Sequence, residues 1–426
     1  MPRTIGLDLS KHTAEVAVLV PGTSLPRRWR FAATPASIRA FAARLEPDDQ
    51  IVFESCTNAF AFHRLLCQHA RKVVVSNPLK TRIIAEAKIK TDKVDAEVLA
   101  RLLAADFLPT VWVPDRVTDQ LRHLVFHRQG LVTQRTQGKN RIHAILHRNL
   151  IVPMMTDLFG KAGRQFLAGA DLPEAERELL DADLRTINFL DTEIAAAERS
   201  MAAAVHQDAQ VQRLVTIPGI SLTSAAALRA AIGDVRRFKT APNLVSYFGL
   251  NPSVYQSGLK AYTGHISRRG RSHARSVCIE VAHVLARVPG PFHAFFQRLR
   301  RRKPYNVALT AVARKLVVLV WHMLTHEEDY RFAPPARTRD KINRMRRLAS
   351  VPDRTTAARP DPARDRDLAV QAQLEYEQFI ASRFGLLGPE AIQHPHRTVG
   401  STPSEVKKRT STKKGQGPSG KPHIGA

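Results

Sequence analysis

The chain has 426 residues, 44% of them hydrophobic, which is enough for two or three domains with cores of ordinary size. Its formal net charge of +27 predicts a polyanionic partner, and nucleic acid fits better than a membrane because arginine-rich clusters are spread along the chain. The three cysteines are isolated, which argues against a CxxC zinc motif and a disulfide framework. The N-terminus has no signal-peptide pattern, and the longest apolar run, near 316–324, is too short to span a bilayer, so we expect a cytoplasmic protein without membrane contact.

The first part of the chain has the pattern of a mixed α/β sheet with helices on its faces. Three short strands joined by tight turns are followed by strands that alternate with helical segments. The predicted strands are 4–9, 14–20, 28–32, 50–54 and 72–76.

Carboxylates recur at positions that this sheet would bring together. Asp92 and Asp95 begin the helix predicted after the fifth strand and share one helix face. Alone, the pair has two interpretations, an acidic first turn that favours the helix dipole or one wall of a metal site. Asp8 ends the first strand and Glu54 ends the fourth, so both project from one end of the sheet if those strands are neighbours. Four converging carboxylates repel unless neutralised, and two Mg²⁺ ions would neutralise them and could hold a phosphodiester, as in RNase H-like nucleases and recombinases.

Residues 113–210 predict a helical hairpin or coiled coil. Apolar residues at helical spacing are interleaved with arginines from Leu121 to Leu146, and a second helical stretch follows a break that contains Pro153. The first arm is basic and the second acidic, so the arms should attract each other. Its role is either a simple spacer or an oligomerisation arm.

Residues 211–332 predict a mainly α-helical C-terminal domain. Its Pro218-Gly219 turn suggests a helix-hairpin-helix-like element whose backbone N–H groups face a DNA phosphate, with a plain helix–helix turn as the alternative. Ser257 precedes Gly258 in a turn, and most such serines only form the turn. A glycine- and arginine-rich segment at 264–275 predicts a loop that approaches phosphates closely. The expected nucleic-acid-binding residues are Gly219, Lys260, Arg268, Arg269, Arg271 and Arg275.

Residues 333–426 are rich in Arg, Lys, Pro and Ser and predict a basic, largely disordered tail. One helical patch around 368–384 is the exception.

The motifs jointly resemble those of DEDD-type transposases of the insertion-sequence-110 class. They occur in the family's order over about residues 4–331. The similar stretches are IGLDLSK, VFES, NPLK, KTDKVDAEVLARLL, IPGIS, FGLNPSVYQSG, GHISRRGRSHAR and AVARKLVVLVWHMLTHEEDYR. One departure is Ser55-Cys56-Thr57-Asn58, where the family usually has Thr-Gly after the acid, and it bears on the shape of that loop.

The resemblance implies a RuvC-like catalytic domain at 1–112, in which Asp8, Glu54, Asp92 and Asp95 bind Mg²⁺. It implies that Ser257, in the C-terminal domain, is the nucleophile, and that a structured noncoding RNA encoded by the element guides the protein to donor and target DNA. The expected function is transposition by site-specific DNA recombination, in which strands are cut and rejoined through a phosphoserine.

We expect a dimer or tetramer, in which the acids and the serine can come from different subunits. Two alternatives are a metal-only RuvC-like endonuclease or junction resolvase without a covalent intermediate, and a non-enzymatic basic nucleic-acid-binding protein.

Overall fold

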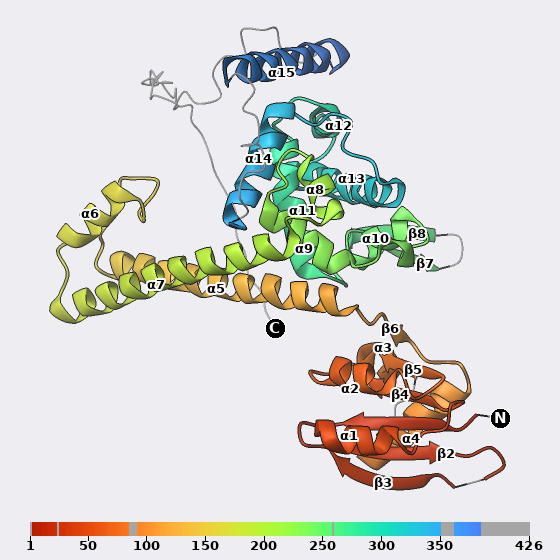
Figure 1. Ribbon diagram of the computed structural model, residues 1–426. Helices are drawn as coiled ribbons and strands as arrows, with labels where there is room; N and C mark the ends of the chain where they lie inside the picture. The colour runs from red at the N-terminus through yellow and green to blue at the C-terminus, as the bar shows by residue number, and fades with distance from the viewer. Residues whose placement is uncertain (1, 24, 85–91, 258–259, 351–361, 385–426) are drawn as a thin grey trace, which may run out of the picture.

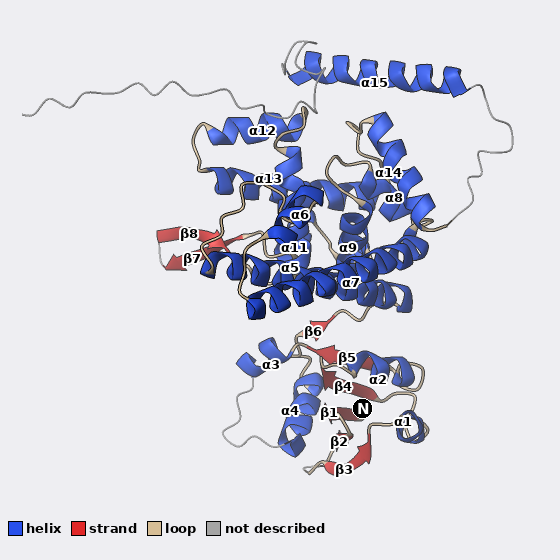
Figure 2. Cartoon of the chain, turned by 90° about the vertical axis from the view of Figure 1, so that its left-hand side faces the viewer, coloured by secondary structure: helices blue, strands red, loops and turns tan. Residues whose placement is uncertain are grey.

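The computed structural model describes residues 2–23, 25–84, 92–257, 260–350 and 362–384 (Figure 1). The chain forms an N-terminal α/β unit, a long helical hairpin and a helical C-terminal unit. The α/β unit lies at one end of the molecule in both views, next to the base of the hairpin (Figures 1 and 2).

The N-terminal unit is built on a mixed six-stranded sheet in the order β3-β2-β1-β4-β5-β6. β1 pairs in parallel with β4, and β4 with β5, while β2, β3 and β6 are antiparallel to their neighbours. The strands are β1 Thr4–Leu9, β2 Thr13–Leu19, β3 Arg27–Ala32, β4 Gln50–Glu54, β5 Lys72–Ser76 and β6 Thr110–Val111. The five predicted strands are confirmed, and so is the pairing of the first with the fourth. β6 was not predicted, because two residues are too few to show an alternating pattern.

The alternation of side chains along β1 assigns the two faces of the sheet. Ile5 and Leu7 are buried in a core shared with α1 (Pro35–Ala42) and α2 (Ala59–Leu66). Gly6 and Asp8 lie on the opposite face, which α4 (Asp92–Ala104) crosses. The backbone of α4 passes so close that a Cβ atom on Gly6 would lie 1.8 Å from the carbonyl oxygen of Ala96. Only glycine therefore fits at position 6, because any side chain there would overlap the backbone of α4.

The hairpin consists of α5 (Arg116–Arg148) and α7 (Glu174–Val205), with α6 (Lys161–Gly169) in the connection at its far end (Figure 1). Four ion pairs join the arms in antiparallel register: Arg128–Glu198 at 2.7 Å, Arg135–Asp191 at 2.8 Å, Arg141–Asp183 at 2.5 Å and Arg148–Glu176 at 2.5 Å. Every pair has its arginine on α5, as the sequence predicted. Ion pairs at a solvent-exposed surface stabilise a fold little, so these four specify register more than stability.

The C-terminal unit is a helical core with one two-stranded hairpin. Its elements are α8 Ala209–Val215, α9 Leu222–Ile232, the short 3₁₀ helix η1 Val235–Arg237, α10 Ala241–Tyr247, β7 Pro252–Ser257, β8 Lys260–Ile266, α11 Ser272–Leu285, α12 Pro291–Arg300 and α13 Tyr305–His326. Among the described helices, α13 alone is long and apolar enough to span a membrane. Its Leu316, Val317 and Val320 are buried in the core of the unit, which accounts for its composition.

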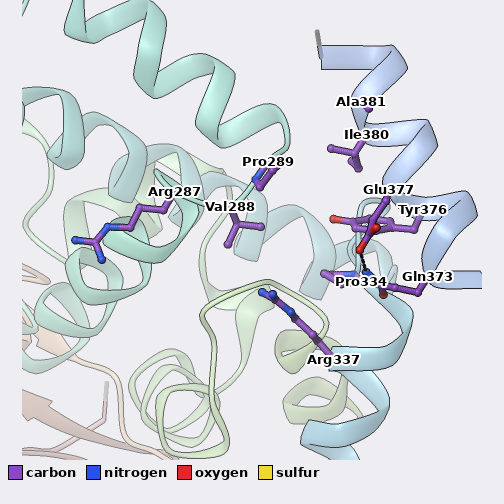
Figure 3. A pocket seen from close by; sticks show the side chains of 10 residues that line it. All are labelled: Arg287, Val288, Pro289, Pro334, Arg337, Gln373, Tyr376, Glu377, Ile380 and Ala381. Carbon is purple, nitrogen blue, oxygen red and sulfur yellow. Dashed lines mark hydrogen bonds between the residues drawn. The ribbon is translucent and has the colours of Figure 1, made fainter. Parts of the chain in front are cut away.

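The prediction that residues 333–426 form a largely disordered tail is wrong for residues 335–348. Residues Pro335–Leu348 form α14, which packs on the C-terminal unit and buries Met345. Pro362–Phe384 forms α15, in agreement with the helical patch predicted there. The Tyr376 hydroxyl donates a hydrogen bond to the Phe332 carbonyl (3.1 Å), and Phe379 stacks on the Phe332 ring. Figure 3 shows the cavity between α15, α14 and residues 287–289.

Candidate active site and nucleic-acid surface

Three of the four predicted acids line one cavity of about 280 Å³ in the N-terminal unit. Asp8 and Glu54 follow a directly paired position of the parallel strands β1 and β4, Leu7 opposite Phe53, so they lie side by side at the carboxyl ends of these strands. Asp95 enters from α4, one turn before Leu99, which packs against the sheet. Asp92 is the first residue of α4, but its side chain lies outside the described residues.

Helix α3 (Pro78–Ile84) also lines this cavity and adds Arg82 to it. The chain enters α3 directly from β5, where Ser76 pairs with Glu54 and hydrogen-bonds to the Thr81 hydroxyl. The acids thus share their cavity with a guanidinium group. Arg82 could not be predicted from the sequence, because a single arginine within a short helix has no pattern of its own.

The loop after Glu54 is the place where the motif departs from the family pattern. Asn58 donates a side-chain hydrogen bond to the Ser10 carbonyl (3.0 Å) and accepts one from the Cys56 thiol (2.9 Å). This joins the loop after β4 to the loop after β1. Partial burial raises the pKa of the Cys56 thiol, and the nearby charges of Asp8 and Glu54 raise it further. Asn58 therefore holds these two loops together beside the acids, and its role was not predicted from the sequence.

Glu15 is a further carboxylate near the site that the sequence analysis did not single out. It pairs directly with Asp8 across β1 and β2, so the two side chains lie on the same face of the sheet. Arg30 forms an ion pair with Glu15 at 3.3 Å. Glu15 therefore has a cationic partner within the protein.

Ser257 lies at the exposed end of the β7–β8 hairpin and pairs with Lys260. The next pair along the strands on the same face is Tyr255 with Tyr262, whose side chains are 69% and 64% exposed. Ser257 was predicted to lie in a turn; the structure makes it the last residue of β7, in a pair of antiparallel strands that was not predicted. The β7–β8 hairpin belongs to the C-terminal unit, whereas the cavity lined by Asp8, Glu54 and Asp95 belongs to the N-terminal unit (Figures 1 and 2).

The four predicted arginines of the 264–275 segment divide into two kinds. Arg268 and Arg269 are exposed in the turn between β8 and α11. Arg271 donates to the Tyr247 hydroxyl (2.7 Å), and Arg275 donates to the carbonyls of Phe248 and Arg268 (3.1 Å each). Arg271 and Arg275 therefore hold the turn in place, and the exposed pair is free to face a partner. Contact with nucleic acid by any of the four stays a prediction.

The Pro218-Gly219 turn joins α8 to α9, as predicted, and it contacts α11 and α14. Gly219 has φ of +84°, and a Cβ atom there would lie 2.8 Å from the Cβ of Val284 on α11. On the other side, the Lys341 ammonium of α14 donates to the carbonyls of Val215 and Ile217, at 2.8 Å each. The turn thus has a structural role, and contact of Gly219 with DNA remains a prediction.

Lys341 gives this region a pH dependence that can be measured. Burial lowers its pKa from 10.5 to about 8. Below pH 8 the lysine is protonated in both states, and the folded state bears the cost of the buried charge, on the order of 3 kcal/mol. Between pH 8 and 10.5 only the unfolded state keeps the proton, so this group makes the fold more stable as pH rises. We expect the free energy of unfolding of Lys341→Met, followed by urea titration, to lack that rise; equal slopes in both proteins would contradict the buried position.

Comparison with known families identifies both halves of the chain. A family model for DEDD transposases of the IS110 type matches residues 5–150, and a model described as the transposase IS116/IS110/IS902 family matches residues 211–297. Together they cover more than half of the chain.

Curated relatives agree over most of their length. A probable family 20 transposase of Pseudomonas aeruginosa is 28% identical over 77% of this chain and 98% of its own. The transposase for insertion sequence element IS1328 of Yersinia enterocolitica is 26% identical over 75% and 96%. The pilin gene-inverting protein of Moraxella bovis is 27% identical over 62% and 75%.

The chain is therefore a transposase, an enzyme of DNA transposition. It belongs to the IS110 class of DEDD transposases. Membership implies a RuvC-like fold for the N-terminal unit, with which the observed mixed sheet agrees, and it implies the use of a divalent metal ion.

Proposed function

We propose that this transposase recombines DNA by cutting and rejoining strands through a covalent bond to Ser257, assisted by Mg²⁺ held by Asp8, Glu54, Asp92 and Asp95. The observation that supports it most is the cavity in which Asp8, Glu54 and Asp95 come together from β1, β4 and α4. A metal-only endonuclease shares these acids and is the second candidate.

The donor set of the cavity suits Mg²⁺, because carboxylate oxygens are the ligands this ion prefers. When bound, the ion would stabilise the charge that develops on the phosphate and activate the attacking oxygen. Among the described side chains, no group of three or more acids, histidines or cysteines is close enough to hold one ion. Binding would therefore draw the acids together, with Asp92 completing the set.

The chemistry assigned to Ser257 is a transfer of one phosphodiester bond. The serine Oγ forms a bond to phosphorus as the bond to one strand oxygen breaks; the serine proton is released and the departing oxygen takes up a proton. Since the new phosphoserine preserves the bond energy, the reverse attack by another strand end rejoins DNA without ATP. Lys260, paired with Ser257 on one face of the hairpin, can bind the phosphate, and the exposed Tyr255–Tyr262 pair offers ring surfaces to a base.

The separation of Ser257 from the acids supports an active site assembled from two subunits. The β7–β8 hairpin and the sheet belong to different units of one chain (Figure 1). Exposed apolar residues at the far end of the α5–α7 hairpin, Leu150, Val152 and Met154, suit a contact between subunits, as expected for a dimer or tetramer. A noncoding guide RNA is part of the proposal on the strength of the family resemblance.

A covalent-adduct assay tests the serine. The protein is mixed with its element's RNA, donor and target DNA and Mg²⁺, and labelled DNA that stays attached to denatured protein is measured. We expect an adduct with the unaltered protein, none with Ser257→Ala, and none in EDTA or with Asp8→Asn.

The matched control is Thr263→Ala, which removes an exposed hydroxyl from the same hairpin and should leave the adduct intact. Hydrolytic nicking that persists in Ser257→Ala without any adduct would favour the metal-only endonuclease. An adduct that survives in Ser257→Ala would rule out this serine as the nucleophile.

A further inference from the structure

Helix α12, helix α13 and the turn between them form a strongly basic corner of the C-terminal unit. Residues 281–326 contain eight lysines and arginines and no aspartate or glutamate. Six of these cations are exposed and make up what we call the basic corner: Arg298, Arg300, Arg301, Arg302, Lys303 and Lys315. Helix α12 lies on the side of the C-terminal unit that faces away from the N-terminal unit (Figures 1 and 2). The basic corner is therefore separate from the acid cavity of the same chain.

Backbone hydrogen bonds give the turn between α12 and α13 a defined shape. The amides of Arg302 and Lys303 both donate to the Leu299 carbonyl, at 3.0 and 2.9 Å. The Arg300 guanidinium donates to the Lys303 carbonyl at 2.9 Å. Since both helices bury their apolar faces in the core of the unit, the cations of the turn face solvent.

Aromatic rings, and not carboxylates, hold several of these cations in place. The Lys315 ammonium lies 4.6 Å from the centre of the Phe295 ring, and the Arg298 guanidinium lies 5.5 Å from the centre of the same ring. The Arg300 guanidinium lies 5.7 Å from the centre of the Tyr305 ring. Contacts of this kind orient a cation without neutralising its charge. Phe295 also brings a cation of α12 and a cation of α13 to one place.

The protein does not supply carboxylates to match this charge. In the part of the chain that the structure describes, none of the six cations forms an ion pair, whereas four arginines of α5 are each paired with an acid of α7. The C-terminal end of the α12 dipole favours cations, which accounts for Arg298 and Arg300. It does not account for Lys315, in the middle of α13, or for Lys303, which lies between two helix ends of opposite partial charge. Stability of the fold therefore does not explain the whole cluster.

We propose that the basic corner binds the phosphate backbone of duplex DNA without reading its sequence. Long side chains with exposed charges fit a row of phosphates, and such contacts fix the position of a duplex but carry no sequence information. An unpaired strand fits less well, because it binds best to free aromatic faces, and the Phe295 and Tyr305 rings are already engaged by cations. The proposal deepens the proposed function by giving DNA a contact away from the acids. It rests on the action of the enzyme on DNA and not on the chemistry of Ser257.

Binding of fluorescein-labelled duplex DNA tests the basic corner. A mixed-sequence duplex of about 20 base pairs is titrated with the full chain in EDTA at several salt concentrations, and fluorescence anisotropy is measured. The triple variant combines Arg301→Ala, Arg302→Ala and Lys303→Ala. We expect its affinity to fall at least about tenfold at about 0.1 M salt. The slope of log affinity against log salt should decrease by roughly 2.7, since each phosphate contact contributes about 0.9.

Two further variants separate binding from folding and from net charge. Asn306→Asp adds a carboxylate to the first turn of α13, which has no acid, so it favours the helix dipole and preserves folding but repels a phosphate. It should weaken DNA binding about threefold with an unchanged or higher melting temperature. The matched control combines Lys161→Ala, Arg185→Ala and Arg199→Ala, which removes three exposed cations from α6 and α7 and the same net charge. This control should bind DNA like the unaltered protein.

The loss of affinity and slope in the triple variant alone supports the basic corner. Unchanged affinity and slope there, or an equal loss in the matched control, would overturn it. A parallel titration with an RNA duplex of the same sequence checks the partner, and weaker RNA binding with unaltered DNA binding would overturn the assignment to DNA.

These binding measurements in EDTA do not depend on Ser257 or on metal. A chain that forms no covalent adduct but responds as expected here would keep the basic corner and lose the proposed chemistry. A chain that forms the adduct while the triple variant binds DNA unchanged would keep the chemistry and lose the basic corner.

Discussion

Gly6→Ala is expected to displace α4 and to abolish strand transfer. The new methyl group would lie 1.8 Å from the Ala96 carbonyl oxygen and 2.9 Å from the Ala100 nitrogen, both backbone atoms that cannot rotate away. Relief requires α4 to move by more than about 1 Å, and a displacement of that size at a catalytic group can cost 10²-fold in rate. Overpacking should also destabilise the N-terminal unit by about 1–3 kcal/mol. Adduct formation and the melting temperature measure the two effects.

Gly130→Ala is the matched control for that substitution. Gly130 lies in α5, and a Cβ atom there would meet nothing within 4 Å. Alanine is a better helix former than glycine, so this variant should be as stable as the original protein or more stable by about 0.5–1 kcal/mol. If Gly6→Ala behaved like Gly130→Ala, the close crossing of α4 over β1 would be wrong.

Gly233→Ala is expected to destabilise the C-terminal unit, and about half of the effect should depend on Trp112. Gly233 ends α9 with φ of +62°, and its Cβ would lie 2.3 Å from the edge of the Trp112 ring. Backbone strain at such a position costs about 1–3 kcal/mol, and the overlap should add about as much. Trp112→Ala removes the obstacle, so in that background only the strain remains. The double-mutant cycle of Gly233→Ala and Trp112→Ala, measured by urea titration, should give a coupling free energy of about 1–2 kcal/mol. The double variant should be less destabilised than the sum of the two single variants.

Gly22→Ala controls for the backbone term of this cycle. Gly22 has φ of +83° in the turn after β2, and its Cβ would meet nothing within 4 Å. The loss of unfolding free energy caused by Gly22→Ala should therefore match the loss caused by Gly233→Ala in the Trp112→Ala background. Strictly additive effects of Gly233→Ala and Trp112→Ala would show that the tryptophan does not cover the glycine.

The N-terminal unit was the part most open to prediction from sequence. Ile5, Leu7 and their counterparts alternate regularly, and a strand-ending acid can be aligned with another as soon as the strands are neighbours. The β7–β8 hairpin has no such pattern, because most of its residues are exposed on both faces and Pro252 and Gly258 indicate turns. Ser257 could therefore be named from resemblance, but its place at a strand end beside Lys260 could not be derived.

Helix α14 shows a different limit of sequence reasoning. Its residues are mainly charged or polar, and Met345 is its one buried residue, so its composition resembles that of a disordered tail. The Lys341 ammonium attaches α14 to the rest of the C-terminal unit, because it donates hydrogen bonds to two carbonyls more than 120 positions earlier in the chain.

The α5–α7 hairpin sets a length scale for any assembly of this enzyme. α5 has 33 residues, which corresponds to about 50 Å, or roughly the length of 15 base pairs of DNA. Helix α5 begins at the unit that bears the acids, and α7 ends at the unit that bears Ser257. The connection with α6 lies at the opposite end of the hairpin (Figure 1). Two subunits joined only at these far ends would hold their reactive groups about 100 Å apart. An active site shared between subunits therefore requires hairpins that cross or lie alongside each other, so that the far end of one reaches the base of the next.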